Sequence, residues 1–319
     1  MRRAVLPGLA IVIGLGAVTA CTRVDVPAAL PRTEQTTTTT AGAALPPVTC
    51  GNPVASLRPS GPATADVPAG SYMDAIRKRG KLRVGVDVST LLFSSVDPFT
   101  GEFKGFDVEI AREVAKALLG DPNKIELVAI PYSARLDVLK NGQVDLVADT
   151  FTINCRRKQE IAFSSQYFSS GQRLLVKSDS KATSLAQLDP SDVVCAALGS
   201  TSIDNLNALP EPHPKALGVA EQADCLVLLQ EGKVDAISTD DTILAGMAAQ
   251  DPNVKIVGPA FSAEPYGLGL PPKHDDWVRY VNGVLENVRS SGRWSALYDT
   301  WLRAVLGPDP GPPPAVYTD

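Results

Sequence analysis

The sequence predicts an α/β protein built as two lobes, and three observations carry this prediction. Apolar runs typical of buried strands alternate with helical patterns, which favours mainly parallel sheets joined by right-handed crossovers. The segment LKNGQVDLVAD, residues 139–149, returns in altered form as LQEGKVDAISTD, residues 229–240. The copies lie in different halves of the chain, and each ends a strand with an aspartate. Because open α/β sheets bind ligands beyond the carboxyl ends of their strands, this pattern indicates a cleft between two similar lobes.

Composition excludes several classes of function. The chain has 319 residues, 44% of them hydrophobic, which is enough to bury one large or two medium cores. Its two histidines, His213 and His274, argue against a histidine metal site and against a histidine-based catalytic triad, which need positioned imidazoles. The formal net charge of -5 argues against nucleic acid, because binding phosphates needs a basic face. We expect no metal and no cofactor.

The N-terminus is typical of an exported lipoprotein. Arg2 and Arg3 precede an apolar run over residues 5–18, which is too short for a comfortable transmembrane span. The sequence VTAC that ends at Cys21 is typical of a bacterial lipobox, in which this cysteine accepts the lipid anchor. A plain secretory signal with an incidental cysteine is the alternative. We expect a protein anchored by lipid to the extracytoplasmic (periplasmic) face of the cell membrane.

Export permits disulfide bonds, and after Cys21 four cysteines remain to form them. Four cysteines allow three pairings. Cys195 lies in a strand-like segment and Cys225 opens a helix of the same lobe, so we pair these two. Cys50 then ties the N-terminal segment to Cys155. Metal binding is less favoured, because the cysteines lack CxxC spacing and histidine neighbours.

The first lobe follows a segment rich in Pro, Thr and Ala, which reads as a flexible linker. Helix caps and stops then mark the elements. In order we expect a helix from Ser71 to Gly80, a strand at 81–88, a helix between Gly105 and Gly120, a strand at 124–131, and a short helix from Ser133 to Gly142.

The second lobe repeats this alternation. Its expected elements are a strand at 193–198, a helix opened by residues 199–202, a strand near 217–219, a helix at 223–230, a strand at 234–238 and a helix from Asp241. Residues 255–259 and a strand at 264–270 return the chain to lobe 1, where helices at 275–290 and 294–305 follow. The resulting domains are the signal peptide 1–21, the linker 22–70, lobe 1 at 71–177, lobe 2 at 178–262, the return to lobe 1 at 263–306 and a flexible tail at 307–319.

Polar side chains follow the predicted strand ends. Arg157 comes after a turn with Thr150 and Thr152, and arginine suits bidentate capture of a carboxylate, although a solvated surface arginine is the alternative. Arg135 lies in a first helical turn, where the helix dipole slightly disfavours a cation, which hints at a use. Asp240 could bind an ammonium group or cap the next helix.

The start of the first lobe 2 helix completes the set. Ser200 and Thr201 open a helix whose free N–H groups can bind an anion, although both are also ordinary caps. Taken together, two arginines, several hydroxyls, a helix N-terminus and a carboxylate complement a zwitterion with an extra negative charge. That description fits an acidic amino acid.

At this point the chain resembles a known family, the type 2 periplasmic (extracellular) solute-binding proteins of polar amino-acid ABC transporters, or solute-binding protein family 3. The similarity covers residues 71–305. The motifs that carry it are residues 81–88 with 105–111, residues 141–146 with Arg157 and 163–164, and residues 199–202 with 234–236. The lipobox, the linker and the extra cysteines resemble most the actinobacterial glutamate-binding lipoproteins of the GlnH type. The resemblance implies two lobes with two crossover strands as a hinge.

The resemblance also implies roles for single residues. Thr150, Thr152 and Arg157 match positions that hold the α-carboxylate of the ligand, and Asp240 matches the group that holds its α-ammonium. The remaining matches are Ser200 and Thr201 at the helix start, Tyr132 lining the site, Arg135 on the distal carboxylate of glutamate or aspartate, and Gln222 near it. Asp87 stands where some relatives that bind acidic ligands carry a second arginine. Asparagine and glutamine therefore stay open as ligands.

The resulting hypothesis is a monomeric receptor, not an enzyme, whose lobes close around glutamate or aspartate by hinge motion. The closed form would then engage a membrane ABC permease. Two alternatives remain open. The closed form could report to a membrane sensor, or the protein could be an exported enzyme on the same fold, which would need a nucleophile or acid with a poised base.

Overall fold

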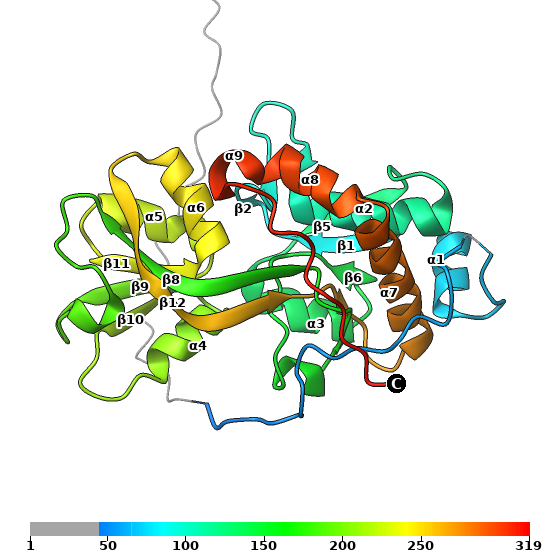
Figure 1. The fold of residues 1–319 in the computed structure, drawn as a ribbon, viewed down its shortest axis with the longest axis horizontal. Helices are drawn as coiled ribbons and strands as arrows, with labels where there is room; N and C mark the ends of the chain where they lie inside the picture. Colours follow the sequence, from blue (N-terminus) through cyan, green and yellow to red (C-terminus); the bar gives the residue numbers. More distant parts are fainter. Residues whose placement is uncertain (1–44, 65) are drawn as a thin grey trace, which may run out of the picture. The chain divides into compact units, whose positions relative to one another are not determined.

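The computed structural model describes residues 45–319 except residue 65, and these residues form two lobes, each with a five-stranded sheet. The strand order is β5-β1-β6-β13-β7 in lobe 1 and β10-β9-β11-β8-β12 in lobe 2 (Figure 1). The strands of lobe 1 are β1 (Leu82–Val86), β5 (Ile125–Ala129), β6 (Leu146–Val147), β7 (Ala162–Phe163) and β13 (Gly269–Leu270). Those of lobe 2 are β8 (Phe168–Lys177), β9 (Val193–Ala197), β10 (Lys215–Val219), β11 (Ala236–Asp240) and β12 (Val254–Tyr266).

Helices flank both sheets. Lobe 1 carries α1 (Tyr72–Arg79), α2 (Phe106–Leu119), η1 (Tyr132–Ala134), α3 (Arg135–Lys140), η2 (Arg157–Gln159), α7 (Asp275–Ser290), α8 (Arg293–Trp301) and α9 (Arg303–Leu306). Lobe 2 carries η3 (Leu185–Gln187), α4 (Thr201–Asn207), α5 (Gln222–Gln230) and α6 (Asp241–Gln250). A small antiparallel sheet of β2 (Ser89–Thr90), β3 (Ser94–Val96) and β4 (Phe103–Lys104) precedes α2, and the sequence analysis did not predict it.

The predicted parallel pairing holds at the centre of each sheet. Strand β1 pairs in parallel with β5 and β6, and β9 pairs in parallel with β10 and β11. Strands β8 and β12 form an antiparallel pair that runs from one lobe to the other (Figure 1), and they are the two expected crossover strands. Because β8 pairs with β11 from Gln172 to Val176, the second sheet begins before the expected boundary at residue 178.

The aspartate of the repeated Val-Asp sequence makes the same pair of backbone hydrogen bonds in both lobes. The Asp145 carboxylate accepts a 2.7 Å hydrogen bond from the Arg83 backbone N–H, and the Asp145 N–H donates to the Arg83 carbonyl. In lobe 2, Asp235 makes the same two bonds with Val193. Each aspartate therefore closes the start of a central strand and fixes the register of the strand that leads to the cleft.

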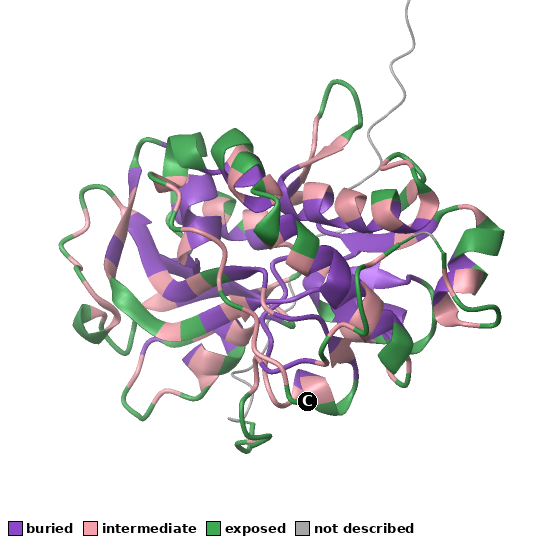
Figure 2. Ribbon diagram, turned by 45° about the vertical axis from the view of Figure 1, so that its right-hand side comes forward, coloured by how far each residue is buried: buried purple, intermediate pink, exposed green. Residues whose placement is uncertain are grey.

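Aromatic side chains form much of the lobe 1 core, in which the faces of the sheet and the inner sides of the helices are buried (Figure 2). Phe106 packs edge-on against Trp294 of α8, and Phe168 at the start of β8 stacks on the same indole. Gly105 lies before α2 with a φ of +136°, and an added Cβ would lie 2.2 Å from the Phe93 carbonyl oxygen. Only glycine fits this approach, which seats α2 against the small sheet.

Several predicted boundaries are wrong. Residues 45–70, expected to be linker, are held against lobe 1 in their described part, because the buried Ser56 hydroxyl donates to the Phe163 carbonyl. The tail from residue 307, expected to be loose, is also docked, because Ser56 and Tyr317 form a β-bridge. Ser133 does not cap a helix, since η1 begins before it, and the last expected helix breaks into α8 and α9.

Two disulfide bonds join Cys50 to Cys155 and Cys195 to Cys225, which are the two predicted pairs. The first ties the N-terminal segment to the turn before η2, and the second joins β9 to α5. Cys21 and the expected signal peptide lie outside the described residues. Within the described residues, every helix is too short or too polar to cross a bilayer.

Candidate functional site

The carboxyl end of β6 carries a strained turn that faces lobe 2. Thr150 has a φ of +40°, which is rare for a β-branched residue and typical of functional sites. Its backbone N–H donates a 2.6 Å bond to the carboxylate of Asp107 on α2. The Tyr167 hydroxyl donates to the same carboxylate, at 2.6 Å. Asp107 is fully buried, which raises its pKa to about 7, and its two bonds hold the turn in place.

Two buried guanidinium groups lie side by side on this wall. Arg135 begins α3 and is 2% exposed, and Arg157 begins η2 and is 6% exposed. Both stack over the ring of Phe151, at 4.4 Å and 4.7 Å from its centroid. Burial, with a further contribution from the Arg135 charge, lowers the pKa of Arg157 to about 9, so the group is charged at neutral pH.

Lobe 2 meets these arginines with the turn before α4. The Gly199 carbonyl accepts one bond from Arg135 and one from Arg157, each 3.1 Å long. Ser200 is the N-cap of α4, because its hydroxyl accepts from the Ile203 N–H. Thr201 donates its hydroxyl to Glu264 of β12, at 2.6 Å. The lobes are therefore closed on each other here.

Asp240 ends β11 on the same side. It is 4% exposed, and its carboxylate accepts a 2.6 Å bond from the Tyr266 hydroxyl. Although Asp240 stands at the N-cap position of α6, its side chain makes no capping bond there. Burial, with Glu264 contributing next, raises the pKa of Asp240 well above its usual range. The carboxylate of Asp240 therefore lies in the cleft and does not cap α6, which was the alternative role that the sequence allowed.

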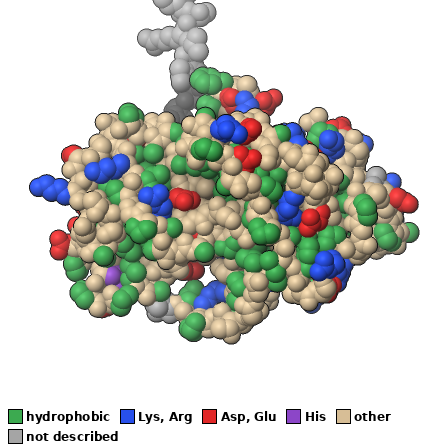
Figure 3. Space-filling view, viewed as in Figure 1, with side chains coloured by type: hydrophobic (Ala, Val, Ile, Leu, Met, Phe, Trp, Pro, Cys, Tyr) green, Lys and Arg blue, Asp and Glu red, His purple; other side chains and the backbone are tan. Residues whose placement is uncertain are grey.

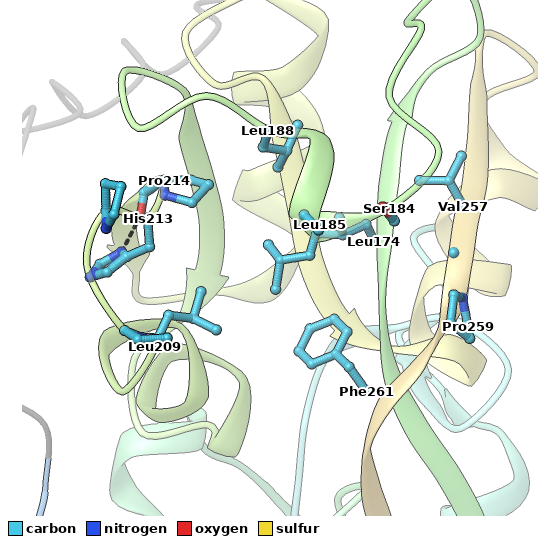
Figure 4. A pocket seen from close by; sticks show the side chains of 14 residues that line it. Leu174, Ser184, Leu185, Leu188, Leu209, His213, Pro214, Val257, Pro259 and Phe261 are labelled. Carbon is cyan, nitrogen blue, oxygen red and sulfur yellow. Dashed lines mark hydrogen bonds between the residues drawn. The ribbon is translucent and has the colours of Figure 1, made fainter.

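These groups surround one small cavity between the lobes. Its volume is about 10 Å³, which is about the space that a single water molecule needs. A larger cavity, of about 380 Å³, lies within lobe 2 between Leu185, Leu209 and Phe261 (Figure 4). Its lining is apolar, and it lies away from the strand ends, so it lacks the charges that a zwitterion needs.

Comparison with known proteins places this cleft in a family. Residues 82–304 match the bacterial extracellular solute-binding proteins, family 3. The chain belongs to this family. The solved structure of a solute receptor for L-cysteine from Neisseria gonorrhoeae aligns with a TM-score of 0.70 and 29% identity, over 75% of this chain and 97% of that chain. The fold is that of the type 2 periplasmic binding proteins.

Three curated relatives of this solute-binding protein are named for polar amino acids. The glutamine-binding protein of Geobacillus stearothermophilus is 44% identical, over 62% of this chain and 75% of its own length. The ABC transporter glutamine-binding protein GlnH of Bacillus subtilis is 36% identical, over 72% and 84%. The glutamate/aspartate import solute-binding protein of Escherichia coli is 28% identical, over 75% and 82%. All three are named as binding or import proteins.

The solute-binding protein brings most of the predicted site residues together. Those that line the small cavity are Tyr132, Arg135, Thr150, Thr152, Arg157, Ser200, Thr201 and Asp240. Their contact with a ligand stays a prediction. Ser200 is also an ordinary helix cap, which was the alternative role for this residue. Its hydroxyl caps α4 and donates a 2.6 Å hydrogen bond to the Ala197 carbonyl.

Two predicted residues do not line this cavity. Asp87 is buried and accepts bonds from the backbone and hydroxyl groups of Ser89 and Thr90, so it organises the loop after β1. The Thr90 hydroxyl in turn shares a 2.8 Å hydrogen bond with the Tyr132 hydroxyl. Asp87 is therefore linked to the cavity through Thr90 and Tyr132. Gln222 accepts from the Ala197 N–H and lines a separate pocket beside α5 and α6.

Other residues of the site were missed. Phe151, Tyr266 and Glu264 support the charged groups, and the cavity also includes Ser202, Thr239 and Ile243. Asp149 is fully buried beside Arg135, with 3.9 Å between its Oδ2 and the arginine Nε. The repeated segment pointed to Asp149, because Asp149 ends its first copy just as Asp240 ends its second copy. No pattern in the sequence pointed to Glu264.

The face of the molecule that Figure 3 shows carries a mixture of charges. Figure 3 shows Lys and Arg side chains interspersed with Asp and Glu on the viewed face of the described residues, without a broad patch of either sign. Among the described residues no cluster of three or more His, Cys, Asp or Glu side chains could hold a metal ion.

Proposed function

We propose that this solute-binding protein captures a polar α-amino acid, with a carboxyl or carboxamide side chain, between its closing lobes. Arg157 receives the α-carboxylate, together with Thr150 and Thr152. Asp240 receives the α-ammonium from lobe 2. The side chain extends towards Arg135, and the candidate ligands are glutamate, aspartate, glutamine and asparagine.

The observation that carries the proposal is the pairing of two unmatched charges. Among the described residues, Arg157 makes no ion pair with a carboxylate, and its N–H bonds go to the carbonyls of Thr152 and Gly199. Asp240 accepts from one hydroxyl, that of Tyr266, and forms no ion pair with a basic side chain among the described residues. Buried charges of this kind are stable only with compensating partners. A zwitterion supplies a carboxylate to one and an ammonium to the other.

Ligand entry requires the lobes to separate. The closed cavity has room for about one water molecule, whereas an amino acid needs space for its whole backbone and side chain. Strands β8 and β12 connect the lobes and can bend as a hinge, as in other periplasmic binding proteins. Ligand binding then favours the closed form, because only that form brings both walls into contact with the ligand.

The closed protein presents its ligand to a membrane ABC transporter, and a lipid on Cys21 holds it at the extracytoplasmic face. The name of the Bacillus subtilis relative, an ABC transporter glutamine-binding protein, supports the first part, and the lipobox supports the second. A membrane sensor that reads the same closed form is the second candidate partner. The protein itself performs no chemistry on the ligand in this proposal.

Calorimetric titration of four amino acids tests the proposal. Glutamate, glutamine, aspartate and asparagine are titrated into the wild type, Arg157→Ala and Arg156→Ala. Arg156 is the matched control, because it stands in the same turn but donates to the Pro46 carbonyl instead of lining the cavity. We expect Arg157→Ala to raise the dissociation constant at least ~100-fold, in line with 2–5 kcal/mol or more for one partner of a buried charge pair.

Two outcomes would contradict the proposal. If wild-type protein binds none of the four ligands, the ligand class is wrong. If Arg157→Ala binds as tightly as Arg156→Ala, the assignment of the α-carboxylate site is wrong. Release of a chemically altered amino acid on prolonged incubation would instead favour the enzyme alternative.

A further inference from the structure

Arg135 does not stand alone in the cleft, because a buried carboxylate lies against it. Asp149 is 0% exposed and Arg135 is 2% exposed. The nearest atoms of the two charged groups, Asp149 Oδ2 and Arg135 Nε, are 3.9 Å apart. The Asp149 carbonyl also accepts a 3.0 Å bond from Arg135, so the backbone fixes the two residues relative to each other.

The guanidinium group of Arg135 is fixed on every side. Its other hydrogen bonds go to the carbonyls of Tyr132 and Gly199, at 3.0 Å and 3.1 Å. Its plane lies over the rings of Tyr132 and Phe151, at 4.3 Å and 4.4 Å from their centroids. All of these partners are uncharged. The charge of Arg135 therefore finds its only carboxylate ion-pair partner, among the described residues, in Asp149.

Asp149 depends on Arg135 in return. Neither of its side-chain oxygens has a hydrogen-bond partner within the described part of the chain. The two other buried carboxylates near the turn differ in this respect, because Asp87 accepts from Ser89 and Thr90 and Asp107 accepts from Thr150 and Tyr167. Asp87 and Asp107 accept hydrogen bonds from backbone N–H groups, whereas Asp149 has only the electrostatic attraction of Arg135 to offset the cost of its burial.

The charge balance of the cleft then decides which side chain fits. Arg157 is matched by the α-carboxylate of a bound amino acid and Asp240 by its α-ammonium. Burial raises the pKa of Asp149 well above its usual range, and the charge of Arg135 opposes this shift. In its ionised form Asp149 cancels the charge of Arg135, so the side chain of the ligand then meets a neutral pair. A side-chain carboxylate would bring an uncompensated negative charge into the closed site, whereas a carboxamide would not.

We infer that Asp149 determines specificity, by neutralising Arg135 so that the site prefers an amide side chain, as in glutamine, over the matching acid. This inference rests on the proposed function and refines it. It also changes the expectation from the sequence, in which Arg135 was to bind a distal carboxylate. Removing the Asp149 charge frees Arg135 for that carboxylate and moves the preference towards glutamate.

The test compares glutamine and glutamate by calorimetric titration of the wild type, Asp149→Asn and Asp204→Asn. Asp204 is the matched control for loss of negative charge, because it lies exposed on α4, close enough to influence Arg157 electrostatically, yet outside the cavity. We expect the wild type to bind glutamine more tightly than glutamate by at least ~10-fold. Asp149→Asn should lower this ratio at least ~10-fold, and Asp204→Asn should leave it within about 3-fold.

The outcomes separate the inference from the function on which it rests. If neither ligand binds the wild type, the proposed function fails. If both bind but the wild type prefers glutamate, or Asp149→Asn leaves the ratio unchanged, the inference is overturned and the function stands. An equal change in Asp204→Asn also overturns it, because the effect would then be a general one of charge. If Asp149→Asn does not fold, Asp149→Ala takes its place, and the wild-type ratio alone still decides the direction.

Discussion

Arg135 and Arg157 donate to the same acceptor across the cleft, the carbonyl oxygen of Gly199, over 3.1 Å each. The arginines belong to lobe 1 and the carbonyl to lobe 2, so both bonds exist only when the lobes are closed. Gly199 has a φ of +76°, and an added Cβ would lie 2.6 Å from the Ser133 Cα of lobe 1. Glycine at this position therefore permits the close approach that brings the arginines to lobe 2.

We expect Gly199→Ala to open the ligand-free protein. Overpacking of a close contact costs about 1–3 kcal/mol, so the ratio of closed to open molecules should fall roughly 5- to 150-fold. Gly232→Ala is the control, because Gly232 has a similar φ of +71° but its added Cβ would meet nothing nearer than the Lys177 Nζ, at 3.7 Å. Single-molecule energy transfer between dyes on the two lobes measures the ratio. Equal opening in both variants would show that backbone strain, not contact between the lobes, is responsible.

The sequence was most informative where one local pattern decides the structure. Ser71 and Gly80 bound α1 as expected, with the Ser71 hydroxyl accepting from Asp74 and Gly80 in the left-handed conformation. The repeated Val-Asp units predicted matching strands in two lobes, and the structure shows why, because Asp145 and Asp235 make the same backbone bonds. The family resemblance then supplied the residues that meet at the strand ends.

Features set by distant contacts were missed. Glu264 reaches Thr201 only because the long strand β12 passes behind α4, and nothing in its local sequence indicates that neighbour. Residues 45–70 and 307–319 are rich in Pro, which is typical of loose segments, yet they hold each other through the bridge between Ser56 and Tyr317. Each of these two segments gains its order from a partner far along the chain, which a local pattern cannot reveal.

The disulfide between Cys50 and Cys155 should stabilise both the fold and the ligand site. It closes a sequence separation of 105 residues, for which the chain-entropy model gives about 4.7 kcal/mol of stability. It also anchors the turn that carries Arg157, which Lys158 supports by bonds to the carbonyls of Pro53 and Ala55. Replacing both cysteines by serine should therefore lower the unfolding free energy and weaken ligand binding roughly 2- to 10-fold, as expected when one mobile side chain must be ordered on binding.

Replacing Cys195 and Cys225 by serine provides the comparison. That bond closes a separation of only 30 residues and lies between β9 and α5, away from Arg157. Guanidinium unfolding should show the smaller loss of stability, and calorimetry should show ligand affinity within about 2-fold of the wild type. Equal loss of affinity in both double variants would contradict a specific role for the first bond.

The C-terminal segment should contribute to the stability of lobe 1. Its backbone bonds Ser56 twice, through the Val316 carbonyl and the Thr318 N–H. Deleting residues 314–319 should lower the unfolding free energy by about 1–3 kcal/mol, since each net hydrogen bond contributes about 0.5–1.5 kcal/mol. Ligand affinity should not change, because the segment does not reach the cleft. Asp319→Asn is the control and should have little effect, because it removes the exposed ion pair with Arg279 but keeps an oxygen that can accept from the Arg58 N–H.

The Asp107 carboxyl should make stability fall as the pH rises towards neutral. Burial raises the pKa of Asp107 from 3.8 to about 7. Between these values the folded protein keeps a proton that the unfolded chain has lost, so the stabilising contribution is complete below pH 3.8 and is lost as the pH passes about 7. At about 1.4 kcal/mol per pH unit, the loss is on the order of 4 kcal/mol.

Asp107→Asn removes this titration while keeping an oxygen that can accept the Thr150 N–H. The unfolding free energies of the wild type and the variant should therefore converge or cross between about pH 4 and pH 7, with the wild type losing more. The buried carboxyl of Asp240 is present in both proteins and cancels in the difference, whereas the pKa of Asp149, which burial raises and Asp107 raises further, should fall in the variant. Denaturant unfolding without ligand across this pH range measures the difference in unfolding free energy between the two proteins. If the two curves run parallel, Asp107 is charged in the folded protein. Its two hydrogen bonds would then fully offset the cost of burying the charge.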